Sequence, residues 1–369
     1  MKINPVMKYK LYFLLAFMLL SGLTASSQQV SDSKTFKKSF RVGKNPALDV
    51  SNKYGNIHIS HTTGDSVSIM AEITATSANE ARLEGMMSDV EISLTMTGET
   101  VRAQTLFGKK VNALFESFKG LTKNIINYES RLQINYFITC PPSTTIRLAN
   151  SYGDVYIGEE TPELTLTLSN GSLDADKVSN ALSMNLTFCK AEIRSIEKGR
   201  LSISYGELRA KEAGVISLTS RSSKVRIEKA RELDLDSKRD DVVIGECFVV
   251  TGTTYFSDLI AEQLNRELSL VTKYGNLSCN TISEGFSLID ISSSYTDVDL
   301  SMDAKASYGF EIRHTDAFVS LPGVSPVPEK TEISAENKVY LTSGNVGSSP
   351  DKSRIRIDAT KGEIRLVQK

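Results

Sequence analysis

The chain has 369 residues, of which 40% are hydrophobic and 24% charged, with 43 basic and 44 acidic side chains. This length allows one extended domain or two compact ones. The balanced charge argues against nucleic-acid binding, which normally needs a concentrated positive face. The four cysteines lie far apart and are too few for a small fold held by disulfides, so we expect buried or unpaired thiols.

The first 27 residues have the layout of a secretory signal peptide. Lys2, Lys8 and Lys10 precede an apolar run at 11–20, and small residues at 25–27 offer a cleavage signal. The apolar run is too short to span a bilayer comfortably. We therefore expect export to the periplasm, the outer-membrane surface or the medium, with an uncleaved membrane anchor as the alternative.

Residues 28–140 are predicted to form a β-rich N-terminal region. It contains an early copy of a repeat at 48–59 and a short helix at 77–87, with Asn79 or Ser77 as its cap. Alternation of apolar and polar residues predicts further strands in this region. These strands are expected at 66–74, 90–95, 101–105 and 131–139.

A helical insertion is expected within this region at 107–126, because apolar residues recur there at helical spacing. The apolar positions that would share one face are Phe107, Val111, Leu114, Phe115, Phe118, Leu121 and Ile125. Such a helix could lie on an anionic membrane surface or in a partner's groove. It could instead pack on its own domain as a lid or end cap. We favour packing, since Gly108 and Gly120 weaken the isolated helix.

A self-similar unit, mostly 17–18 residues long, dominates the chain from about residue 146 to 302. Its clearest copy reads Leu-x-x-x-Tyr-Gly-x-Val-x-Ile from Leu148 to Ile157. Three apolar columns persist through successive units, with Gly252 as a single exception. The first of these columns holds Val155, Leu173, Ala191, Leu208, Val225, Val242, Leu259, Leu277 and Val298.

Period-two alternation inside each unit indicates strands with one buried face. One unit is too short to bury that face alone, whereas stacked units can do so around a narrow core. We predict an all-β fold, a β-solenoid over residues 141–369, with a β-sandwich of hairpins as the alternative. Glycines are expected at the turns because they accept backbone angles that other residues avoid. These turn glycines are Gly153, Gly171, Gly206 and Gly275.

A fourth column directly precedes the turns and is rich in aromatic residues. It holds Tyr152, Asn170, Phe188, Tyr205, Ser222, Arg239, Phe256, Tyr274 and Tyr295. The rings could form a strip for stacking on sugars, or they could line a corner of the coil and pack on each other. The polar interruptions and the absence of Trp from the sequence favour packing.

These parts resemble the bacterial "putative adhesin" β-repeat families, which include the auto-transporter-adhesin-head-like domains. The resemblance covers the copy at 48–59, the strand and prolines at 134–142, the Asn-Ser-Tyr-Gly-Asp-Val turn at 150–155 and the repeats through Tyr308. It implies an extracytoplasmic β-solenoid with a role in adhesion or envelope organisation, and it brings no catalytic residues. The insertion at 107–126 departs from the family pattern.

No catalytic, metal or cofactor site emerges from the sequence. His58 and His61 would point to opposite faces of a strand, so we expect a solvated pair rather than a metal site. We expect a non-enzymatic scaffold that binds an unknown envelope or surface partner, with no small-molecule substrate evident. The alternatives are a periplasmic accessory protein that contacts a membrane or partner through 107–126, and a carbohydrate-active β-helix enzyme.

Overall fold

The computed structural model describes residues 29–108, 130–323 and 328–369. Its strands form one long, mostly parallel sheet, so the predicted all-β, solenoid-like fold is confirmed. The predicted signal peptide and all but the first two residues of the predicted insertion lie outside this part of the chain. In the described part, no helix is both long and apolar enough to cross a membrane.

The chain divides into two compact units. The smaller one includes residues 73–90 and helix α2 (Glu80–Ser88), which begins where Asn79 accepts a hydrogen bond from the Arg82 amide at 2.9 Å. This geometry confirms the predicted short helix and Asn79 as its cap. The larger unit comprises Thr35–Glu72, Glu91–Leu106 and Gln133–Lys369. The division of the chain at residue 140 stays a prediction.

The strands of the N-terminal region are β1 (Val30–Arg41), β2 (Ala47–Lys53), β3 (Ile57–His61), β4 (Ser66–Ser77), β5 (Val90–Thr97), β6 (Thr100–Phe107) and β7 (Ser130–Cys140). Strand β1 was not predicted; the others match the expected ranges within a few residues, and β6 runs slightly further than expected. Phe107 therefore ends a strand and does not begin a helix. The Gly108 amide extends the strand pairing by donating a hydrogen bond to the Asp89 carbonyl at 2.8 Å.

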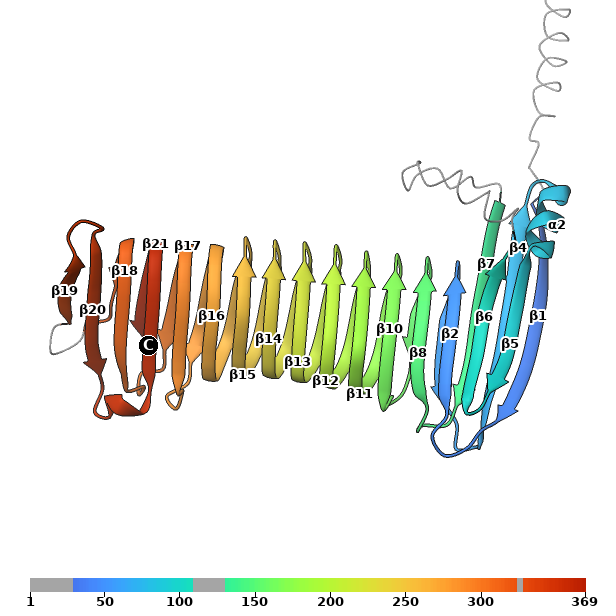
Figure 1. The fold of residues 1–369 in the computed structure, drawn as a ribbon, viewed down its shortest axis with the longest axis horizontal. Helices are drawn as coiled ribbons and strands as arrows, with labels where there is room; N and C mark the ends of the chain where they lie inside the picture. Colours follow the sequence, from blue (N-terminus) through green and yellow to red (C-terminus); the bar gives the residue numbers. More distant parts are fainter. Residues whose placement is uncertain (1–28, 109–129, 324–327) are drawn as a thin grey trace, which may run out of the picture. The chain divides into compact units, whose positions relative to one another are not determined.

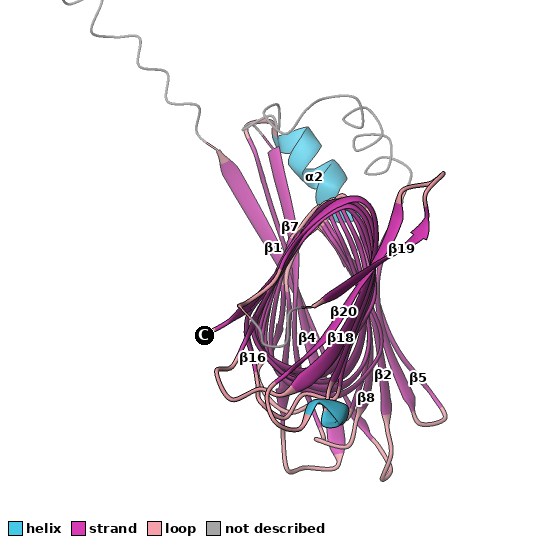
Figure 2. Cartoon of the chain, turned by 90° about the vertical axis from the view of Figure 1, so that its left-hand side faces the viewer, coloured by secondary structure: helices cyan, strands magenta, loops and turns pink. Residues whose placement is uncertain are grey.

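The repeats form a stack of parallel coils, drawn in chain order from β8 to β17 in Figure 1. These strands are β8 (Thr145–Ser151), β9 (Val155–Ile157), β10 (Glu163–Ser169), β11 (Ser172–Thr187), β12 (Lys190–Ser204), β13 (Glu207–Arg221), β14 (Lys224–Lys238), β15 (Asp241–Tyr255), β16 (Asp258–Ile282) and β17 (Leu288–Met302). Val225 pairs with Val242 and Ile227 with Ile244 in adjacent coils, as the column spacing predicts. Viewed along the stack, the coils superimpose (Figure 2).

Each complete coil is one strand that bends, not two strands joined by a tight turn. In β13 the inward positions are Leu208 and Ala210, then Ala213, then Ile216 and Leu218. The period-two alternation therefore slips by one residue twice, and these slips carry the chain from one face of the coil to the other. The middle column of Ala213 and its equivalents was missed from the sequence because it is out of phase with the regular alternation.

The turn glycines serve a different purpose from the one expected. Among the corner glycines, Gly153 and Gly171 do not have positive φ; the residue before each one does. A Cβ on Gly171 would lie 2.0 Å from the Gly153 carbonyl oxygen of the preceding coil, and one on Gly153 would lie 2.0 Å from that of Gly55. At Gly153 and Gly171 the close approach of the stacked corner therefore leaves no room for a side chain, whereas other coils accommodate a small or polar one at the same position, in Cys189, Ser223, Asp240 and Ser257.

Both ends of the stack are built out of chain order. The coil of β2 and β3 pairs with β8 and β9 on one side and with β6 and β7 on the other. The last strand, β21 (Arg354–Gln368), lies between β17 and β18 (Tyr308–Ser320). Beyond β18, the strands β20 (Val339–Val346) and β19 (Glu329–Ser334) add antiparallel pairs, and a short 3-10 helix (Pro350–Lys352) precedes β21.

Candidate functional site

The first candidate surface is the corner of the coils, where one residue per coil adopts a left-handed conformation. These corner residues are Tyr54, Tyr152, Asn170, Phe188, Tyr205, Ser222, Arg239, Phe256, Tyr274, Tyr295, Lys361 and Asp316, with φ between 50° and 65°. A left-handed non-glycine residue costs roughly 1–2 kcal/mol. Pairing between coils holds the conformation: the Tyr205 amide, for example, donates a hydrogen bond to the Arg221 carbonyl of the next coil at 2.9 Å.

The aromatic rings of this corner stack on each other yet remain largely exposed. Ring centroids lie 5.1 Å apart for Phe188 and Tyr205, 4.7 Å for Phe256 and Tyr274, and 5.0 Å for Tyr274 and Tyr295. The favoured interpretation, rings packing on each other, is borne out by these contacts. The Tyr205 side chain is nevertheless 58% exposed and that of Phe256 50%. The rings thus form a solvent-facing ladder, not a buried one.

The longest stretch of the ladder, which we call the corner cluster, consists of Tyr255, Phe256, Tyr274 and Tyr295. Tyr255 meets the Phe256 ring edge-on, with centroids 4.6 Å apart. At the C-terminal end the Lys361 ammonium lies 4.8 Å from the Tyr295 ring centroid and 3.1 Å from its hydroxyl. Because the rings of the column cover one another's faces, the cluster offers edges, hydroxyls and a cation, not a flat platform for a sugar.

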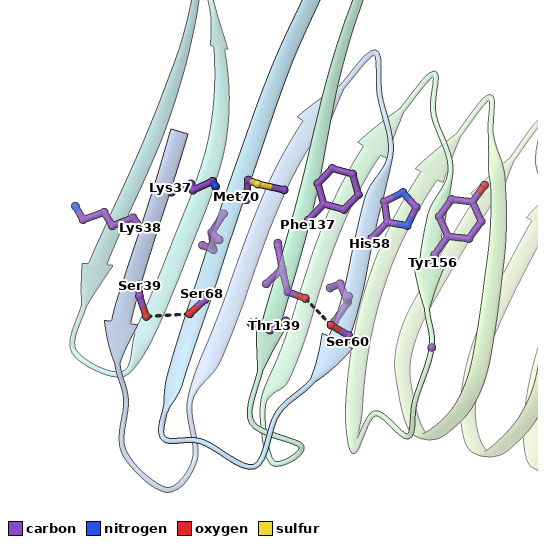
Figure 3. Close-up of a pocket in the computed structure, with 14 residues that line it drawn as sticks. Lys37, Lys38, Ser39, His58, Ser60, Ser68, Met70, Phe137, Thr139 and Tyr156 are labelled. Atoms are coloured by element: carbon purple, nitrogen blue, oxygen red, sulfur yellow. Dashed lines mark hydrogen bonds between the residues drawn. The ribbon is translucent and has the colours of Figure 1, made fainter. Parts of the chain in front are cut away.

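The second candidate surface is an open hollow on the outer face of the N-terminal coils, which we call the His58 depression (Figure 3). Its volume is about 770 Å³, and it is lined from β1, β3, β4, β7 and β9. The His58 ring lies between those of Phe137 and Tyr156, with centroids 4.9 and 4.5 Å away. Strand register produces this triplet, because His58 pairs with Phe137 on one side and Tyr156 on the other.

The two histidines of the predicted solvated pair do point to opposite faces, but neither is freely solvated. Burial lowers the pKa of His58, and the Asp154 carboxylate partly opposes the shift. The His61 side chain points inward and is only 5% exposed; its Nδ1 lies 3.7 Å from the Glu159 carboxylate, and its Nε2 is buried without a hydrogen-bond partner. Burial also lowers the pKa of His61. The expectation of a solvated pair was wrong because other strands cover both rings.

The described residues contain no group of three or more His, Cys, Asp or Glu side chains placed to hold a metal ion. The acidic stretch at 234–241 is instead divided among separate contacts. Asp240 is buried and accepts hydrogen bonds from the Ser223 amide at 2.7 Å and the Ser237 hydroxyl at 2.7 Å. Asp236 pairs with Arg221 on the surface. The carboxylates therefore stabilise the coils and do not converge on one ion.

The predicted interaction helix lies almost entirely outside the described residues. Phe107 ends strand β6, as noted above, and the remaining positions belong to the undescribed segment at 109–129. Those positions are Val111, Leu114, Phe115, Phe118 and Leu121. Their role as an interaction surface stays a prediction.

No family model matches this sequence, and no curated protein matches it significantly. Solved structures that it is similar to include a putative adhesin from Bacteroides fragilis, with a TM-score of 0.30, 12% identity, and coverage of 73% of this chain and 97% of that one. A putative adhesin from Parabacteroides merdae gives a TM-score of 0.32 at 10% identity, and the match covers 72% of this chain and 96% of that one. A putative cell adhesion protein from Clostridium sporogenes gives a TM-score of 0.20 at 10% identity, and the match covers 91% of this chain and 100% of that one.

Likeness at these TM-scores carries no functional argument. The functional proposal rests on this chain's own surfaces.

Proposed function

We propose that this chain is an exported, non-enzymatic, adhesin-like or envelope scaffold protein that binds a surface partner through its repeated β faces. The observation that supports this most is the exposed aromatic ladder held in a left-handed backbone conformation at the corner of the coils. The corner cluster at Tyr255, Phe256, Tyr274 and Tyr295 is the part of the ladder proposed to make the contact.

Coil formation alone does not explain these rings. Asn170, Ser222 and Arg239 occupy the same corner position, so the coil closes without an aromatic residue there. Stacking of an aromatic pair contributes roughly 0.5–1.5 kcal/mol. The cost of the left-handed conformation, roughly 1–2 kcal/mol, is common to every corner residue, so the gain from stacking is a modest addition to the stability of the coils. Exposed aromatic side chains, tyrosine in particular, are typical anchors of binding surfaces.

The lining of the His58 depression supports a non-enzymatic function. Polysaccharide-cleaving enzymes of the glycoside hydrolase type place two carboxylates about 5–10 Å apart across the scissile bond. None of the described residues that line the depression is an aspartate or glutamate. Some surface carboxylates of the coils are held in ion pairs, as for Asp176 with Arg194 and Glu197 with Lys177.

The test compares adhesion of beads coated with the chain from residue 28 onward to epithelial cells and to outer-membrane vesicles. The triple variant Phe256→Asn, Tyr274→Asn, Tyr295→Asn removes the rings but keeps a residue type that tolerates the left-handed conformation, as Asn170 already does. We expect the fold to be retained, with a melting temperature lowered by only a few degrees through the loss of stacking. Adhesion to one of these two surfaces should fall to a small fraction of that of the wild type.

The control replaces exposed apolar side chains away from the corner by threonine, at Val215, Phe248 and Val271. It should adhere as the wild type does. Equal adhesion of the corner variant and the control, or no adhesion of the wild type to either surface, would contradict the proposal.

A further inference from the structure

The His58 depression brings together a lysine, a row of serine and threonine hydroxyls and partly exposed rings on one outer face. Its volume of about 770 Å³ lies within the ~300–1,000 Å³ range of small-molecule sites. The lining residues used below are Lys37, Lys38, Ser39, Ser60, Ser68, Phe137, Thr139, His58 and Tyr156. They come from β1, β4, β7, β3 and β9, so the site exists only when the end coil is assembled.

Positive charge enters the depression from β1 alone. Lys37 and Lys38 are the charged side chains among the described lining residues. The Lys38 ammonium lies on the opposite face of β1, since it donates a hydrogen bond to the Leu94 carbonyl at 3.0 Å and lies 4.9 Å from the ring centroid of the buried Phe40. Lys37 is therefore the cation that faces the hollow, while the Asp154 carboxylate next to the hollow accepts a hydrogen bond from the Tyr156 hydroxyl at 3.3 Å. Lys37 is exposed. The charge at this rim favours an anionic ligand.

Hydroxyl groups extend across the floor from β1 to β3. The Ser39 and Ser68 hydroxyl oxygens lie 2.9 Å apart, and the Ser60 hydroxyl donates to the Ile138 carbonyl at 3.4 Å. Thr139 pairs with Ser60 across the strands and lies beside it (Figure 3). A hydroxyl both donates and accepts, so this row matches a ligand that itself carries several hydroxyl groups.

The aromatic triplet leaves ring surface uncovered. The rings of Phe137, His58 and Tyr156 are nearly parallel, with interplanar angles of 8° and 6°. Centroid separations of 4.9 and 4.5 Å place these rings face to face, as at the corner, so the triplet presents ring edges to the depression. Phe137, at the end of the triplet, is 37% exposed.

We infer that the His58 depression binds an acidic saccharide, a sugar unit that carries a carboxylate. Lys37 meets the carboxylate, the row of hydroxyls from Ser39 to Thr139 meets the sugar hydroxyls, and the exposed part of the Phe137 ring contacts the apolar face of the sugar ring. This inference rests on the proposed function, because it names the chemical class of a partner that a surface scaffold would contact, at a site separate from the corner cluster.

The test measures binding of two tetrasaccharides by calorimetry and saturation-transfer NMR to the chain from residue 28 onward. One probe alternates glucuronic acid and N-acetylglucosamine, and the other is neutral cellotetraose. We expect binding of the acidic probe, with the neutral probe weaker by about tenfold or more. Lys37→Gln, which changes an exposed side chain, and Phe137→Ala should each weaken the acidic probe by about tenfold.

Matched controls are Lys211→Gln and Phe248→Ala, which make the same changes at exposed positions of the coils remote in sequence from the depression. Both should bind as the wild type does. Equal binding of the two probes, no effect of Lys37→Gln, or no binding of the acidic probe would overturn the inference. If the saccharide inference is overturned in this way, bead adhesion that still depends on the corner cluster would show that the proposed function holds without a saccharide site.

Discussion

Val298 of β17 pairs with Ile364 of β21, although β18 is the next strand along the chain. Residues 309–320 of β18 pair with the other side of β21. The final coil is therefore inserted between two coils that precede it in sequence. The chain cannot close its C-terminal end until its last residues are in place, and an unpaired edge would remain on either side without them.

We expect the insertion of β21 to be essential for stability. Ile357 is 2% exposed and pairs with Ile291 on one side and Ile312 on the other. Ile357→Lys should lower the free energy of unfolding by several kcal/mol, because a buried charge without a partner is costly. Asp358→Lys changes the exposed neighbour and should alter it by no more than about 0.5 kcal/mol. Urea denaturation measures both, and equal effects would contradict the inserted coil.

The close approach of corners gives a second prediction. Gly171→Ala places a methyl group 2.0 Å from the Gly153 carbonyl oxygen, so the stacked coils must separate locally. We expect a loss of about 1–3 kcal/mol in the free energy of unfolding, the usual cost of overpacking. Gly285→Ala is the control, since a Cβ there meets nothing within 4 Å. Chemical denaturation of both variants decides whether the glycines serve close approach, and a neutral Gly171→Ala would argue against it.

Acid should destabilise the protein through its histidines. Burial lowers the pKa of His58, His61 and His314 in the folded state, so below the ordinary value of about 6.5 the unfolded chain binds more protons than the folded one. Stability is therefore complete above that pH and falls as the pH drops towards the lowered folded-state values. The melting temperature of His61→Gln should fall less steeply below pH 6.5 than that of the wild type, because one of the three contributing histidines is removed. An unchanged slope would mean that His61 is not buried.

The four cysteines should be inert in the native protein. Cys140, Cys189, Cys247 and Cys279 are all buried and unpaired with one another. Burial raises the pKa of Cys140 to about 11 and of Cys247 to about 12, so little reactive thiolate forms near neutral pH. We expect no reaction with a thiol reagent at pH 8 and four equivalents after denaturation. Reaction of a folded sample, or fewer than four thiols after unfolding, would contradict this arrangement.

Two interpretations from the sequence changed for a shared reason. The corner glycines read as turn residues, but the carbonyl of the preceding coil is what excludes a side chain at Gly171. His58 and His61 read as a solvated pair, but Phe137 and Tyr156 from other strands enclose the first ring. In both cases the deciding neighbour is distant in sequence, so the local pattern contains no sign of it.

The sequence by itself determined the coil. Repetition at 17–18 residues with period-two alternation leaves an apolar stripe that only an identical neighbour can cover, so parallel stacking in register, as between Val225 and Val242, follows from local pattern. The tertiary structure alone decided which coils become neighbours at the two ends. At the two ends Ile57 pairs with Val155, and Val298 pairs with Ile364. By local sequence pattern alone, each of these residues could pair equally well with apolar residues of other coils. Their partners, and with them the His58 depression, are selected only when the whole stack closes.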